Sequence, residues 1–209
     1  MSRASSERVY KVLPELVVFD LDECLWSPEM YTLNDVPTVA SKVIGPLPNG
    51  VGEGVIGVRS GREVIRIFPD ALTILQDIHS GKYPNVRIAA ASSADTPLAV
   101  KIGKTSMGLL EVVPGVTMRE VFASGWEPTF DGNIQIGRTP PLSSDKSSSH
   151  FPILKRETRV GYEKMIFFDD CNWGDHCAKV AQKCPGVVTQ RTPNGLQMHE
   201  WHSCLVAYA

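Results

Sequence analysis

Two short apolar runs, each followed at once by acidic residues, constrain this chain more than any other feature. Residues 16–19 (Leu-Val-Val-Phe) lead into Asp20-Leu21-Asp22, and residues 165–168 (Met-Ile-Phe-Phe) lead into Asp169-Asp170. A continuous run of about four apolar residues is typical of a strand buried in a parallel sheet. Ligands of open parallel sheets bind beyond the carboxyl ends of the strands. The sequence therefore predicts that these carboxylates share one crevice.

The segments between and after these runs alternate between strand and helix patterns, which indicates an α/β fold. We expect further strands at residues 64–67, 87–91, 121–123 and 186–189. We expect helices at residues 69–80, 97–107, 149–158 and 174–183, with Ser149 as a possible cap, and a last helix near the C-terminus.

A length of 209 residues suits a single domain over residues 1–209, with a flexible N-terminus of about residues 1–12. Residues 37–61 are rich in Gly, Pro and Val, and residues 125–149 are rich in Gly, Pro and Ser. We expect both to be long loops, which in compact domains are usually functional or disordered. Since both follow strands that carry polar candidates, we expect them to border one site.

Composition excludes several classes of partner and location. The net charge of -2 gives no reason to expect nucleic acid or an anionic membrane as partner. The chain has no apolar run long enough to span a bilayer or to serve as a signal peptide, so we expect a cytoplasmic protein. Its five cysteines, an odd number, argue against a disulfide framework. The sequence provides no basis for an oligomeric state.

The converging carboxylates predict a divalent metal. Several carboxylates in one crevice repel one another, and a cation relieves this repulsion. Oxygen ligands without sulfur or nitrogen suit Mg2+. The alternative is that each Asp is only a turn former or helix cap at a strand end. His199, His202 and Cys204 form a second possible metal group, but structural zinc normally uses paired thiolates, so an ordinary C-terminal helix is the simpler interpretation.

Hydroxyl and lysine side chains accompany the carboxylates. Ser92 and Ser93 follow the strand expected at residues 87–91, and hydroxyls and amides at such a turn can hold a phosphate. Lys146 lies in the long loop before the helix that leads to Asp169, where it can supply a point charge to a phosphate. Each residue taken alone has a simpler interpretation, as helix-capping serines or a solvated lysine.

These residues together resemble a known family. Residues 19–26 (Phe-Asp-Leu-Asp-Glu-Cys-Leu-Trp) are similar to the first motif of the haloacid dehalogenase (HAD) superfamily, and the Leu-Trp ending is similar to that of its magnesium-dependent phosphatases. The similarity continues at residues 67–70, 88–92, 149–151 and 167–170. The resemblance implies a Rossmann-like sheet with helices on both faces, a minimal cap and an open site. The chain departs from the family at Cys24, where Thr is commoner, at Ser93, where Arg is usual, and in its long loop before residue 149.

The resemblance also implies a chemistry for the acidic residues. Asp20 would attack phosphorus and form an aspartyl phosphate, while Asp22 would act as the general acid and base. Mg2+ would be held by Asp20, the backbone carbonyl of Asp22 and Asp169. Asp170 and Asp175 are expected to lie around these metal ligands and to support them without binding the metal.

Substrate binding is assigned by the same resemblance to Leu21, Ser92, Ser93 and Lys146. The lysine assignment has an alternative in Lys155, which lies inside the expected helix. We favour Lys146 because a loop residue at the edge of the sheet can reach the crevice, and because it lies closest to the position of the motif lysine.

The expected substrate is a phosphorylated small molecule or a phosphoprotein, with phosphotyrosine and phosphorylated sugars both plausible by resemblance. One alternative is a phosphatase acting on phosphoserine in polymerase tails, which normally has Asp-Asn in place of Asp169-Asp170. Another is a non-catalytic phosphate- or protein-binding module on the same fold, although such modules typically lose one of the two Asp residues. A dehalogenase is disfavoured by Asp22.

Overall fold

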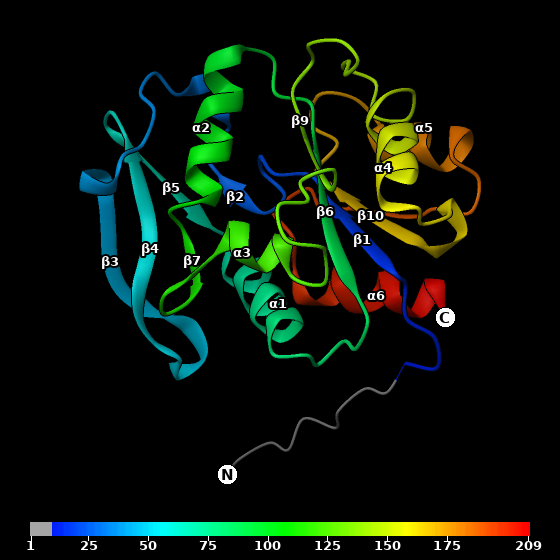
Figure 1. Cartoon of the computed structure of the whole chain (residues 1–209), viewed down its shortest axis with the longest axis horizontal. Coiled ribbons are helices and arrows are strands. Elements are labelled where there is room, and N and C mark those ends of the chain that lie inside the picture. Colours follow the sequence, from blue (N-terminus) through cyan, green and yellow to red (C-terminus); the bar gives the residue numbers. More distant parts are fainter. Residues whose placement is uncertain (1–9) are drawn as a thin grey trace.

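A parallel sheet of five strands forms the centre of the molecule, in the order β11-β10-β1-β6-β9 (Figure 1). The computed structural model describes residues 10–209, so most of the N-terminal segment expected to be flexible lies outside the described residues. The strands are β1 (Leu16–Phe19), β6 (Arg87–Ser92), β9 (Ile134–Ile136), β10 (Met165–Asp169) and β11 (Val188–Arg191).

Strand register brings the two acidic motifs together. Leu16 pairs with Met165 and Phe19 with Phe168, so β1 and β10 end at the same level. The amide of Asp20 continues the ladder by donating to the carbonyl of Phe168 at 2.9 Å. The carboxyl ends of the two strands therefore deliver their acidic residues to one edge of the sheet.

Helices cover both faces of this sheet, which confirms the expected α/β, Rossmann-like class. Side chains alternate along a strand, so Val17 and Phe19 enter one core while Leu16 and Val18 enter the other. Helices that contribute to the first core are α1 (Pro69–His79), α2 (Pro97–Met107), α3 (Met118–Ala123) and α6 (Met198–Tyr208). The second core is covered by α4 (His150–Thr158) and α5 (His176–Lys183).

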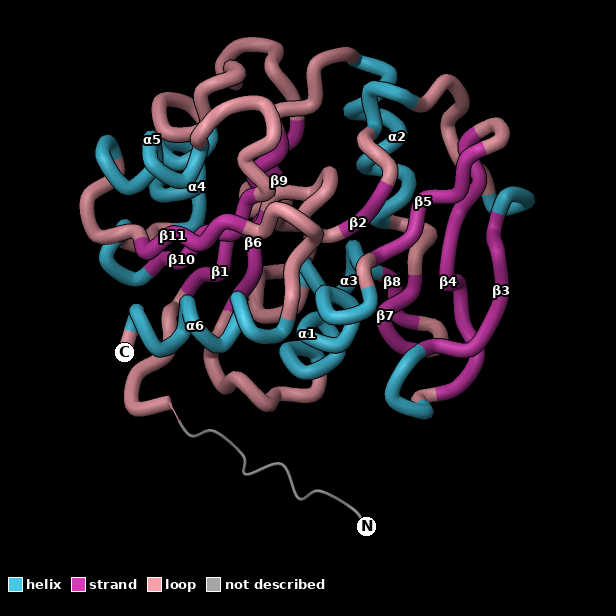
Figure 2. The backbone as a smooth tube through the Cα atoms, turned by 180° about the vertical axis from the view of Figure 1, so that it is seen from behind, coloured by secondary structure: helices cyan, strands magenta, loops and turns pink. Residues whose placement is uncertain are grey.

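A second, antiparallel sheet lies beside the first and is inserted between β1 and β6 (Figure 2). Its order is β2-β5-β4-β3, with bounds Trp26–Ser27, Glu63–Ile67, Gly52–Ser60 and Lys42–Leu47. A small pair, β7 (Glu111–Val113) and β8 (Val116–Thr117), and the 3-10 turns Met30–Thr32, Val39–Ser41, Pro48–Gly50 and Tyr162–Lys164 complete the secondary structure.

The expectation of a long loop at residues 37–61 is wrong, because these residues contain the β3–β4 hairpin. Two of its glycines, Gly54 and Gly57, lie where close packing inside the sheet leaves little room for a side chain. A Cβ at Gly54 would lie 2.6 Å from Leu47 Cδ1, and one at Gly57 would lie 2.8 Å from Val64 Cγ1. These glycines made the segment look like a loop in the sequence. In the structure they leave room for neighbouring side chains to pack directly against the strand.

Two further expectations are corrected by local hydrogen bonding, and one short strand was not expected. The strand expected at residues 121–123 is the end of α3, which begins earlier because Thr117 and Glu120 form a capping box. Strand β9 was missed because it is only three residues long within a loop-like segment. Ser149 precedes α4, but its hydroxyl bonds the carbonyl of Asp145 rather than capping the helix.

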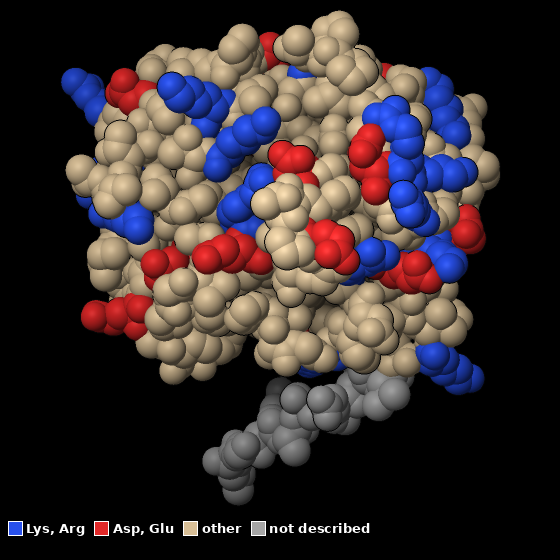
Figure 3. All heavy atoms as spheres, in the orientation of Figure 1, with Lys and Arg blue, Asp and Glu red and all other residues tan. Residues whose placement is uncertain are grey.

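The five cysteines are all free and buried. Within residues 10–209, no helix combines the length and apolar character needed to cross a membrane. On the face shown in Figure 3, Lys and Arg side chains are interspersed with Asp and Glu side chains.

Candidate active site

The turn after β1 fixes the first two acidic residues. The carbonyl of Leu21 accepts the amides of Leu25 (2.8 Å) and Trp26 (3.1 Å), which closes a tight loop directly after Asp20. Within this loop Asp22 Oδ1 accepts the indole N–H of Trp26 at 2.8 Å, and Asp22 Oδ2 accepts the amide of Met30 at 3.0 Å. Asp22 is thereby held beside β2 of the second sheet.

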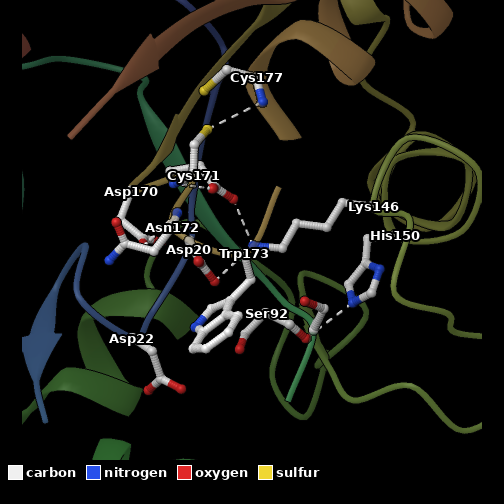
Figure 4. Close-up of polar contacts among 12 residues, drawn as sticks. Asp20, Asp22, Ser92, Lys146, His150, Asp170, Cys171, Asn172, Trp173 and Cys177 are labelled. Atoms are coloured by element: carbon white, nitrogen blue, oxygen red, sulfur yellow. Dashed lines mark hydrogen bonds and ion pairs between the residues drawn. The ribbon is translucent and has the colours of Figure 1, made fainter. Parts of the chain in front are cut away.

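The turn after β10 fixes the second acidic pair. Asp169 Oδ1 accepts the amide of Cys171 at 2.8 Å, and Asp170 Oδ2 accepts the amide of Asn172 at 3.0 Å (Figure 4). Cys171 adopts a left-handed conformation with φ 59°, which turns the chain sharply at this point. Each carboxylate keeps one oxygen free of these backbone bonds.

Asp20, Asp169 and Asp170 form a buried cluster in which one carboxylate oxygen from each lies within 4.8 Å of the others. Burial raises the pKa of Asp20 well above its usual range, and the negative charges of Asp169 and Asp170 raise it further, although Lys146 opposes this. Burial and the charge of Asp169 also raise the pKa of Asp170. An environment that penalises several negative charges together favours a cation.

Lys146 supplies one positive charge to the cluster. Its Nζ lies 2.8 Å from Asp20 Oδ1 and 2.6 Å from Asp169 Oδ2, and its side chain is 1% exposed (Figure 4). Burial alone would lower the pKa of Lys146, but the attraction of Asp169 and Asp20 raises it above its usual value. The lysine is therefore charged whenever the two carboxylates are.

The loop that carries Lys146 has an internal hydrogen bond and is anchored to α5 and to the end of β6. The carboxylate of Asp145 accepts the amide of Ser147 at 3.0 Å and Nζ of Lys183, from α5, at 2.8 Å. His150, the first residue of α4, places Nε2 3.0 Å from the carbonyl of Ser92 at the end of β6. Burial and the nearby Lys146 lower the pKa of His150 to about 4, so the ring is neutral near pH 7 and bonds that carbonyl as a donor.

Asp22 differs from the other acids in its environment. Its pKa is raised to about 7, chiefly by burial, while the hydrogen bonds from Trp26 and Met30 act in the opposite direction. A carboxyl group with a pKa near 7 can both donate and accept a proton at neutral pH.

A pocket of about 340 Å³ opens above the cluster. Its buried floor includes Asp20, Ser92, Lys146 and Asp170, and Asp22 and Ser93 also line it. Its exposed mouth includes Tyr31, Asp95, Arg138 and Trp173, with Glu29 between them. A volume of this size is within the range of small-molecule sites.

Not every residue selected from the sequence reaches this pocket. The side chain of Leu21 is fully buried in the hydrophobic core, so only its backbone is available to a substrate. Asp175 is exposed and caps α5 by accepting the amide of Ala178 at 2.9 Å; it belongs neither to the acid cluster nor to the pocket lining, and its expected support of the metal site stays a prediction. Asp170 lies in the cluster itself rather than outside it. Lys155 lies elsewhere, with Nζ 4.5 Å from the ring centroid of Tyr162.

Several pocket residues were missed in the sequence because nothing in their local pattern marks them. Arg138 follows β9, and its Nε donates to the carbonyl of Ser93 at 2.6 Å. The guanidinium of Arg138 thus lies beside Ser93, which occupies the position at which the family usually has an Arg. Glu29, Tyr31 and Trp173 come from two loops that are about 140 residues apart in the sequence, and only the fold brings them together.

Comparison with known proteins agrees with this geometry. A HAD-like hydrolase superfamily protein of Schizosaccharomyces pombe is 27% identical over 157 residues, covering 75% of this chain and 76% of the relative. The crystal structure of the N-terminal part of a Bacteroides fragilis protein, containing a phosphatase domain complexed with Mg, has a similar fold with a TM-score of 0.51 and 12% identity. That match covers 92% of this chain but only 40% of the other. The sequence model of the acid phosphatase family matches residues 12–209. This chain therefore belongs to the acid phosphatase family of HAD superfamily phosphatases.

Proposed function

We propose that this protein is a Mg2+-dependent phosphomonoesterase that forms an aspartyl phosphate on Asp20 and acts on phosphotyrosine or phosphorylated sugars. The observation that carries the proposal is the contact of Lys146 Nζ with both Asp20 and Asp169 on the floor of the pocket. The lysine can hold a phosphoryl group through its charge, while the adjacent carboxylate of Asp20 attacks the phosphorus.

The residues present fit a magnesium ion. Asp20, Asp169 and Asp170 offer buried carboxylate oxygens within 4.8 Å of one another, and Lys146 is the cation that contacts the cluster. These are oxygen ligands, as Mg2+ prefers. The family resemblance adds the backbone carbonyl of Asp22. When bound, Mg2+ would neutralise negative charge on the transferring phosphoryl group.

The reaction would proceed in two displacements at phosphorus. In the first, a carboxylate oxygen of Asp20 attacks phosphorus, the ester P–O bond breaks, and the carboxyl group of Asp22 protonates the leaving oxygen. In the second, the Asp22 carboxylate accepts a proton from water, which attacks phosphorus and releases inorganic phosphate. The carboxylate of Asp20 is then restored.

Binding of the phosphoryl oxygens falls to the remaining polar groups of the floor. Lys146 would attract the non-bridging oxygens while it stays charged through its contact with Asp169. Ser92 and Ser93 line the same pocket at the end of β6, and Arg138 adds a guanidinium at its mouth.

The test is turnover of a panel of phosphomonoesters, including phosphotyrosine and glucose 6-phosphate, with and without Mg2+. We expect hydrolysis only with the metal, and loss of hydrolysis in Asp20→Asn, because an amide is a poor nucleophile and a poor ligand for Mg2+. Absence of hydrolysis of every ester by the folded, Mg2+-supplied protein would count against the proposal.

A further inference from the structure

Two exposed aromatic side chains stand at the mouth of the pocket. Trp173 is 69% exposed and Tyr31 is 49% exposed, and both line the cavity that leads to Asp20. The other tryptophans are more shielded: Trp26 and Trp201 are fully buried, and Trp126 is partly buried. Large aromatic surface left open beside a polar pocket is typical of a ligand contact.

The aromatic pair is held in place by specific contacts. Trp173 Nε1 lies 2.8 Å and 3.1 Å from the two carboxylate oxygens of Glu29. The rings of Tyr31 and Trp173 meet edge to face, with centroids 5.7 Å apart and an interplanar angle of 85°. Glu29 directly precedes the 3-10 turn Met30–Thr32, and Tyr31 lies within it. Trp173 follows β10. These contacts therefore join two sides of the mouth.

The position of the pair sets which part of a substrate it can touch. Asp20 and Lys146 lie on the floor of the pocket and the aromatic pair lies at its mouth, so a substrate whose phosphoryl group lies on the floor would place its leaving group at the mouth. The single indole N–H is shared between the two oxygens of Glu29, and this contact holds the ring of Trp173 against the carboxylate. The two rings therefore offer aromatic surface to a leaving group at the mouth.

We propose that Tyr31 and Trp173 form an aromatic wall that binds the leaving group of the substrate and selects aryl phosphates over alkyl phosphates. The leaving-group role rests on the proposed function, because it requires a phosphatase. Binding of a ring at this place does not require turnover and can be measured by itself. An aromatic contact contributes about 0.5–1.5 kcal/mol, which corresponds to a preference of roughly three- to tenfold in affinity.

The experiment measures binding of two non-hydrolysable probes, phenylphosphonate and methylphosphonate, to the full chain with Mg2+ by titration calorimetry. We expect phenylphosphonate to bind roughly three- to tenfold more tightly in the wild type. The ratio should fall toward one in Trp173→Ala and in Tyr31→Ala. Trp173→Phe, which keeps a ring but loses the bond to Glu29, should retain part of the preference.

Val206→Ala is the matched control, because Val206 is 62% exposed on α6 and does not line the pocket. It should keep the wild-type ratio. Phenylphosphonate should also change the fluorescence of the wild type more than that of Trp173→Phe, because Trp173 is the tryptophan at the site.

Equal binding of the two probes by the wild type would overturn the inference, as would a preference that survives in both alanine variants. Dependence on Trp173 for glucose 6-phosphate but not for phenylphosphonate would assign the wall to sugars and overturn the aryl assignment. Hydrolysis of ethyl phosphate tests the proposed function separately. If the protein hydrolyses esters but binds the two phosphonates equally, only this inference fails. If it prefers phenylphosphonate but hydrolyses no ester, only the proposed function fails.

Discussion

Lys146 is the residue whose role depends most on three-dimensional position. Its charge is buried against Asp20 and Asp169, so its removal deprives the phosphoryl group of a cation and leaves buried carboxylates without a partner. We expect Lys146→Ala to lower kcat/KM by about a hundredfold or more. Lys155→Ala is the control, because that lysine lies against Tyr162 and away from the pocket. Near-normal activity of folded Lys146→Ala, with collapse of Lys155→Ala, would reverse the assignment.

Asp22 should matter most when the leaving group is poor. Proton donation assists departure of an alkoxide far more than departure of a stabilised phenolate. We therefore expect Asp22→Asn to slow turnover of alkyl phosphates more than formation of the phosphoenzyme from an aryl phosphate with an acidic phenol. Rapid-quench kinetics on the two esters measures this difference. Unchanged turnover of the alkyl ester would remove Asp22 from the acid–base role.

The acidic residues at the strand ends could be placed from the sequence because a four-residue apolar run fixes where a buried strand stops. The register that the structure shows between β1 and β10 then brings Asp20 and Asp169 together. The sequence around Asp175 does not distinguish the helix cap that the structure shows from a support for the metal. Trp173 and Tyr31 could not be found, since their contact is set by the packing of two distant loops.

At the scale of elements, the loop of residues 143–149 positions Lys146, and Asp145 stabilises this loop. Partial burial raises the pKa of Asp145, but hydrogen bonds from Lys183 and Ser147 outweigh it and hold this pKa below its usual range. A lowered folded-state pKa gives stability that is present above the unfolded pKa of about 4 and is lost as pH falls through the folded pKa.

We expect Asp145→Ala to lower the free energy of unfolding by about 1 kcal/mol at pH 7, because several hydrogen bonds to one charged acceptor are lost. The difference from the wild type should shrink as pH falls below about 4. Thermal unfolding of both proteins between neutral and acidic pH measures it. A difference that grows in acid would show that the carboxylate is not stabilised by these donors.

Long elements with clear periodicity were predictable, whereas short or glycine-rich ones were not. Helix α2 begins and ends at the expected residues, since Pro97 suits the first turn and Thr96 caps the helix. The β3–β4 hairpin was taken for a loop because close side-chain packing over Gly54 and Gly57 cannot be inferred from composition. The α3 error was avoidable, since Thr117 and Glu120 have the spacing of a capping box.

At the scale of the whole molecule, the acid cluster joins β1 to β10, so metal binding should stabilise the folded chain. We expect Mg2+ to raise the Tm of the wild type, because a ligand that binds only the folded state stabilises it. Asp169→Asn should show a smaller rise. A chelator should abolish activity and Mg2+ should restore it. Greater restoration by zinc than by magnesium would contradict a site built from oxygen ligands.

The most direct test of the whole account is chemical identification of the phosphorylated residue. The protein is mixed with an aryl phosphate and Mg2+, quenched within one turnover, reduced with borohydride and analysed by peptide mass spectrometry. Borohydride converts an aspartyl phosphate to homoserine, and we predict this change at Asp20 alone, with none in Asp20→Asn. Homoserine at another aspartate, or turnover with no modified aspartate under conditions that trap acyl phosphates, would contradict the account.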